Sequence, residues 1–271
     1  MIHKKQKLLS CLVGVCLISL FWGTLVSADS DLSNNGSVSV EVSDKTDPID
    51  PENPGNPGTP SNPDDNNYST NGSLRFDFIS PLNFGANKIT KTNRKYAALA
   101  QPFNGNVDAR ANYIQITNHQ DSTAGWTLQV KQNRQFTSVI KDTRLAEELK
   151  GAVLSLDKGW ANSMSDSRPP VVTRETIAIN EMGVTYEVAS AKPNEARGTW
   201  VISFGASDKN TKNQSPTLSP AVDGNNNQLI DEKTKKPLMR NSAVTLTVPD
   251  STTIQPVSYE TELTWVLGKL P

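Results

Sequence analysis

Two Trp-any-Leu tripeptides, Trp126-Thr127-Leu128 and Trp265-Val266-Leu267, carry the side chains of this chain that are best suited to ligand contact. In an extended strand, alternate side chains project to one face, so each tripeptide sets an indole beside a leucine, and Tyr259 shares the face of the second. An exposed indole can stack on a sugar ring, whereas a buried one is an ordinary core residue, which composition alone favours. The candidate binding residues are Trp126, Leu128, Tyr259, Trp265 and Leu267. We expect the two tripeptide strands to meet in space and form one patch.

The sequence does not indicate a catalytic site. His119 lies in a polar turn with no nucleophile elbow near it. The acidic pairs Glu147-Glu148 and Asp231-Glu232 place adjacent carboxylates on different sides of their element, which does not indicate sugar hydrolysis. We therefore expect a protein that is not an enzyme and has no small-molecule substrate.

Metal ligands are equally sparse. The stretch that begins at Asp223 resembles a calcium loop, but Gln228 stands where the turn requires glycine and Thr234 where a bidentate glutamate belongs. An Asn/Gly-rich hairpin turn is the simpler interpretation. Both cysteines, Cys11 and Cys16, lie in the apolar N-terminal segment, so the rest of the chain offers no thiolate and no disulfide. The sequence predicts neither a metal nor a cofactor.

The N-terminus predicts export. Three lysines precede an apolar run over residues 8–26, and Val26-Ser27-Ala28 supplies small residues for cleavage after Ala28, which is typical of a signal peptide over residues 1–28. A retained membrane anchor is the alternative. Removal of three lysines and no acidic residue takes the formal net charge from −1 to about −4, which argues against a nucleic-acid partner. Without a sortase-type motif or hydrophobic tail, we expect the chain to be released or held noncovalently at the surface.

The remaining chain divides by composition. An alternating run within residues 29–43 predicts one strand, and the Pro/Asn/Asp-rich residues 44–72, with prolines three apart, predict a spacer; recognition by a proline-binding module is the alternative. Residues 73–271 contain many period-two runs, which indicate an all-β domain, an antiparallel β-sandwich or barrel-like fold with long loops. One short helix at most is expected, over residues 143–150. The loop over residues 207–241 is long enough to be functional or disordered.

Several short motifs follow one another along the chain in a specific order. They are Gly72-Ser73-Leu74, Asn83-Phe84-Gly85, Gly125-Trp126-Thr127-Leu128, residues 149–156, Gly198-Thr199-Trp200, residues 244–249 and residues 259–271. This ordered set resembles the WxL-domain surface proteins of low-GC Gram-positive bacteria, over essentially the whole chain after the predicted signal peptide. The departures are Phe204-Gly205, where the family leads us to expect a second tryptophan, and the individual loop over residues 207–241.

The resemblance implies noncovalent attachment to the cell wall through peptidoglycan. It also implies protein partners, namely other WxL proteins or membrane-anchored surface proteins. Both agree with the expectation of an exported chain that has no covalent anchor. The alternative is a structural subunit of a surface complex, retained through a membrane-anchored partner, with Trp126 and Trp265 as core or interface residues.

Overall fold

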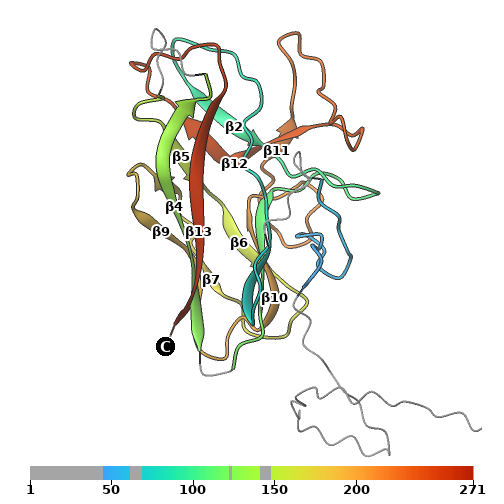
Figure 1. The fold of residues 1–271 in the computed structure, drawn as a ribbon. Helices are drawn as coiled ribbons and strands as arrows, with labels where there is room; N and C mark the ends of the chain where they lie inside the picture. The colour runs from blue at the N-terminus through green and yellow to red at the C-terminus, as the bar shows by residue number, and fades with distance from the viewer. Residues whose placement is uncertain (1–44, 62–68, 122–123, 141–147, 271) are drawn as a thin grey trace, which may run out of the picture. The chain divides into compact units, whose positions relative to one another are not determined.

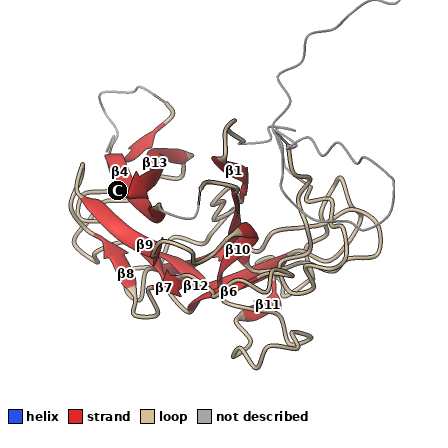
Figure 2. Cartoon of the chain, turned by 90° about the horizontal axis from the view of Figure 1, so that it is seen from below, coloured by secondary structure: helices blue, strands red, loops and turns tan. Residues whose placement is uncertain are grey.

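The computed structural model describes residues 45–61, 69–121, 124–140 and 148–270, which belong to one compact unit. The predicted signal peptide, the strand expected within residues 29–43 and most of the helix expected over residues 143–150 lie outside the described residues. Within them the chain forms thirteen β-strands and no α-helix (Figures 1 and 2). The described part of the chain thus holds no long apolar helix of the kind that crosses a membrane.

The strands form three antiparallel sheets. The first has the order β1 (Leu74–Ile79), β3 (Asn112–Asn118), β10 (Gly198–Phe204), β6 (Gly159–Asn162). The second has the order β11 (Leu218–Pro220), β12 (Met239–Thr247), β5 (Val153–Leu156), β8 (Ile177–Ile179), with β2 (Lys95–Leu99) also paired to β12. The third has the order β13 (Tyr259–Leu270), β4 (Gly125–Ser138), β9 (Thr185–Ala191), β7 (Val171–Val172).

One hydrophobic core joins the inner faces of all three sheets. Ile116 enters it from the first sheet, Leu154 from the second and Leu128 from the third, and all three side chains are buried. The period-two pattern of each strand supplies these inward residues and sends polar ones outward. The predicted all-β antiparallel fold is confirmed, and its form is three sheets packed on one another, as in a sandwich, rather than a closed barrel.

The first sheet is buried on both faces, and every residue of β3 is buried. Its outer face carries an ion pair in which Arg75 Nε donates to Asp77 Oδ1 at 3.0 Å, with each side chain 1% exposed. Burial raises the pKa of Asp77, although hydrogen bonds from Thr117, Gln115 and Arg75 oppose the rise. A charged pair in such a place must be covered by polar groups that complete its hydrogen bonds.

Residues 45–61, which belong to the predicted spacer, contribute to that cover. The backbone N–H of Ile49 donates to Gln115 Oε1 at 2.9 Å, and Gln115 Nε2 donates to the carbonyl of Asp47 at 3.1 Å. Arg75 Nη2 donates to Thr46 Oγ1 at 2.6 Å. Ile49 also packs against a small apolar cluster on the outer face of the sheet that includes Tyr113.

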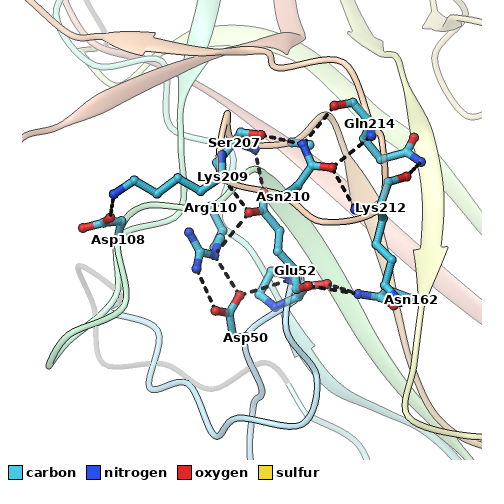
Figure 3. Close-up of polar contacts among 12 residues, drawn as sticks. Asp50, Glu52, Asp108, Arg110, Asn162, Ser207, Lys209, Asn210, Lys212 and Gln214 are labelled. Carbon is cyan, nitrogen blue, oxygen red and sulfur yellow. Dashed lines mark hydrogen bonds and ion pairs between the residues drawn. The ribbon is translucent and has the colours of Figure 1, made fainter.

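Two buried carboxylates fasten the same segment to distant loops (Figure 3). Arg110 donates from Nε and Nη2 to the two oxygens of Asp50, at 2.7 Å each. Glu52 accepts from the backbone N–H and the hydroxyl of Ser207, at 2.6 and 2.5 Å. Asn162 Nδ2 donates to the carbonyl of Pro51 at 3.0 Å. Bidentate pairs of this kind are directional and strong, so the segment is an integral part of the domain.

We predict that Asp50→Asn lowers the free energy of unfolding by about 1–3 kcal/mol, because it removes a charged acceptor from a guanidinium that is largely out of water. Asp108→Asn is the matched control. Its carboxylate pairs with Lys209 at 2.6 Å, but the two side chains are 59% and 68% exposed, and exposed pairs contribute little. Urea unfolding followed by circular dichroism measures both; equal effects would contradict a structural role for the Asp50–Arg110 pair.

Candidate functional site

The strands that carry the two Trp-any-Leu tripeptides are neighbours. β4 and β13 pair in antiparallel fashion almost from end to end and lie side by side in Figure 1. Leu267 pairs with Leu128, while Trp265 pairs with Val130 and Trp126 with Lys269. The expectation that the two tripeptides meet in space is confirmed. The leucines stand opposite each other, and the tryptophans flank them on opposite sides.

The first tripeptide points into the core. The side chains of Trp126 and Leu128 are 0% exposed, and both belong to the main hydrophobic core. On the β9 side, Trp126 pairs with Ala191 and Leu128 with Ala189, and these small partners leave room for the indole. A Cβ at Gly125 would clash with the carbonyl oxygen of Ala191, so close strand approach requires glycine before this tryptophan. For Trp126 and Leu128 the geometry favours packing over a stacking surface.

The second tripeptide is half-buried. Trp265 and Leu267 pack against the edge of the same core. The ring of Trp265 lies 6.4 Å from that of Phe204, centroid to centroid, with 33° between the planes. The position where the family pattern led us to expect a second tryptophan thus holds a ring in contact with the tripeptide, a role that sequence alone did not reveal. Tyr259 packs on a separate apolar cluster, and its hydroxyl accepts from the N–H of Gln255 at 2.9 Å.

The opposite face of these strands is directed away from the core. The middle residue of each tripeptide points there, because adjacent residues of a strand alternate. Gln129 pairs with Val266, and Thr127 with Gly268, so these side chains share the outward face. Val266 is 38% exposed, and Gln129 and Thr127 are partly exposed. Val171 of β7 belongs to the same face through its pairing with Ser190, and it is 67% exposed.

β13 is an edge strand. It pairs with β4 on one side, and no described strand pairs with its other side. Unpaired strand edges present backbone N–H and C=O groups that can accept a further strand. Two apolar residues of this strand, Val266 and Leu270, are 38% and 37% exposed. The free edge is therefore a second accessible surface of the tripeptide region.

The stretch that begins at Asp223 forms a turn. Val222 and Gln228 form a β-bridge, and the carboxylate of Asp223 accepts from the backbone N–H groups of Asn225 and Asn227 at 2.8 and 2.9 Å. These hydrogen bonds lower the pKa of Asp223. The hairpin-turn interpretation is confirmed. Residues 207–241, expected to be one long loop, include β11 and two bridged turns. Among the described residues, no group of three or more His, Cys, Asp or Glu side chains is arranged to hold a metal ion.

Comparison with known proteins gives one match. A family model described as "WxL domain surface cell wall-binding" matches residues 27–271. No curated protein and no solved structure matches the chain. The matched range includes residues 45–61, so the family pattern extends over the segment that covers the first sheet.

We predict that Trp126→Ala lowers the free energy of unfolding by about 3–5 kcal/mol, because it leaves a cavity in a fully buried region. Val266→Ala on the outward face is the matched control, and we expect it to cost less than about 1 kcal/mol. Urea unfolding followed by tryptophan fluorescence and circular dichroism measures both. A small loss with Trp126→Ala would contradict its assignment to the core.

Proposed function

Because the chain belongs to the WxL family of surface cell wall-binding domains, we propose that this cell wall-associated surface protein attaches noncovalently to the wall by binding peptidoglycan. The proposal is for a binding module rather than an enzyme. The observation that carries it is the outward face of β4 and β13, where the middle residues of both tripeptides are accessible. Peptidoglycan is a repeating polymer of sugars and short peptides, which suits an open sheet face better than an enclosed pocket.

Within this proposal the two faces of the tripeptide strands have different roles. Trp126 and Leu128 hold β4 and β13 together from the core side, and the outward side makes the contacts. Thr127 and Gln129 offer hydrogen-bonding groups, and Val266 offers an apolar surface beside them. The half-buried Trp265, Leu267 and Tyr259 lie on the opposite, core-facing side of β13, where they pack against apolar clusters and hold the strand in place. Individual contacts on an open surface are weak, so firm attachment depends on repeated ligand.

The second candidate function is that of a structural subunit held by a membrane-anchored partner protein. The free edge of β13 favours it, because a partner strand can extend the third sheet through backbone hydrogen bonds. Val266 and Leu270 would then contact the partner. In this candidate the indoles of Trp126 and Trp265 remain core or interface residues, and wall contact is indirect.

We predict that the chain without residues 1–28 sediments with sacculi stripped of proteins and teichoic acids. Gln129→Ala combined with Val266→Ala should weaken this binding at least about fivefold, which corresponds to a loss of about 1 kcal/mol, while leaving the fold intact. Val222→Ala is the matched control, because Val222 is 39% exposed against 38% for Val266 and lies in the bridged turn after β11.

The outcomes separate the two candidates. Binding that is lost in the folded double variant and kept in Val222→Ala supports peptidoglycan contact through the outward face. If the folded double variant still binds, the binding site lies elsewhere on the domain. Sedimentation with walls that keep their proteins, but not with protein-free walls that keep their teichoic acids, would indicate attachment through a protein partner. Trp126→Ala, run in parallel, should lose binding only to the extent that it unfolds.

A further inference from the structure

A cavity of about 290 Å³ lies where the first and second sheets join. Its lining comprises Lys158 and Gly159 at the turn from β5 to β6, Arg174 after β7, Gly205 after β10, and residues 213–215. No residue of β4 or β13 lines it, so this cavity is separate from the tripeptide strands.

The two cations of this cavity have no bonded carboxylate partner among the described residues. Lys158 and Arg174 are both exposed, and neither side chain forms a hydrogen bond or ion pair with the described residues. No carboxylate belongs to the lining. The carboxylate of the adjacent Asp157 is engaged by the backbone N–H of Lys158 at 2.8 Å. Two cations that line a polar hollow without a bonded carboxylate attract anionic oxygen groups.

A second cavity differs in the pairing of its cations. It has a volume of about 410 Å³, and its lining includes Arg110 and Lys209. Each of these cations already has a carboxylate partner, since Arg110 pairs with Asp50 and Lys209 with Asp108 (Figure 3). This second cavity therefore offers no free positive charge, and the one at Lys158 and Arg174 does.

The loop over residues 213–215, which supplies neutral groups to the cavity, is held by the side chain of Asn210. Asn210 Nδ2 donates to the carbonyls of Ser207 and Gln214 at 2.7 and 2.9 Å, and its Oδ1 accepts from the backbone N–H of Gln214 at 2.9 Å (Figure 3). Ser207 is anchored in turn by Glu52. The side chains of Asn213 and Ser215, which follow on this braced loop, form no hydrogen bond with the described residues. They add free donors beside the two cations.

We propose that this cavity binds an anionic oxygen group of the cell wall, either a carboxylate or a phosphate. Arg174 supplies a planar fork and Lys158 a point charge, and both geometries suit such groups. Carboxylates occur on the peptides of peptidoglycan, and phosphodiesters on wall teichoic acids. The inference rests on the proposed function and adds to it a second, electrostatic contact.

The test compares three forms of the chain without residues 1–28: the parent, Lys158→Gln/Arg174→Gln, and a control that loses the same charge, Lys88→Gln/Lys91→Gln. The control lysines are exposed residues of the loop before β2 and do not line the cavity. Each form is sedimented with stripped sacculi, which keep carboxylates, and with sacculi that retain teichoic acids. In parallel, backbone amide shifts of Gly159 and Gly205 are followed by NMR during titration with inorganic phosphate and with N-acetylmuramic acid.

We expect the cavity variant to bind about fivefold to tenfold more weakly than the control, because two exposed ion pairs are lost. Weakening on stripped sacculi identifies the carboxylate, and weakening only on teichoic acid-bearing sacculi identifies the phosphate. Equal binding by the cavity variant and the control overturns the inference and leaves the proposed function intact. If the parent binds neither preparation, the proposed function fails; the inference then stands only if the amide shifts of the parent respond to a probe and those of the cavity variant do not.

Discussion

The antiparallel ladder between β4 and β13 is the constraint on which the tripeptide region depends, because it fixes which residues face the core. A shift of the pairing by one residue would turn every inward side chain of β13 outward. Trp265 and Leu267 would then leave the core edge, and Val266 would take their place. On its other side β4 pairs with β9, where alanines stand opposite Trp126 and Leu128 and where Gly125 allows the strands to approach. A bulky residue at any of these positions would force the three strands apart.

The buried polar face of the first sheet imposes a second constraint. The ion pair between Arg75 and Asp77 is 1% exposed on both sides, and an incompletely hydrogen-bonded pair at that depth would be costly. Thr46 accepts a hydrogen bond from Arg75, Gln115 and Thr117 donate to Asp77, and backbone groups of residues 45–61 hold Gln115. The segment is itself secured by Asp50 and Glu52. Its prolines suit this task, because a chain with few N–H groups can lie over a sheet without leaving many donors unpaired.

The sequence predicted which residues form strands and that the two tripeptide strands meet. It did not predict which face of each strand is buried. Period-two runs such as Trp126, Leu128 and Val130 identify which residues share a face, but not whether that face meets the core. The structure shows that the face with the tryptophans is the inner one. The packing of residues 45–61 was not predictable from composition, because its partners are remote: Arg110 lies 60 residues from Asp50, and Ser207 lies 155 residues from Glu52. The same holds for the cavity at Lys158 and Arg174, whose charges are 16 positions apart in the chain and meet only through the turns after β5 and β7.

Each of the two proposed contacts includes a residue at one edge of the third sheet. The outward face with Val266 is at the β13 edge, whereas Arg174 of the cavity lies two residues after the end of β7, which forms the other edge. Three strand spacings separate these edges, about 14 Å. The exposed Val171 lies on the outward face at the β7 edge, so the accessible surface continues across the sheet. A polymer with sugar and anionic groups in alternation can span that distance and engage both contacts at once. Each contact then raises the effective concentration of the ligand at the other, so two weak contacts reach a retention that neither provides alone.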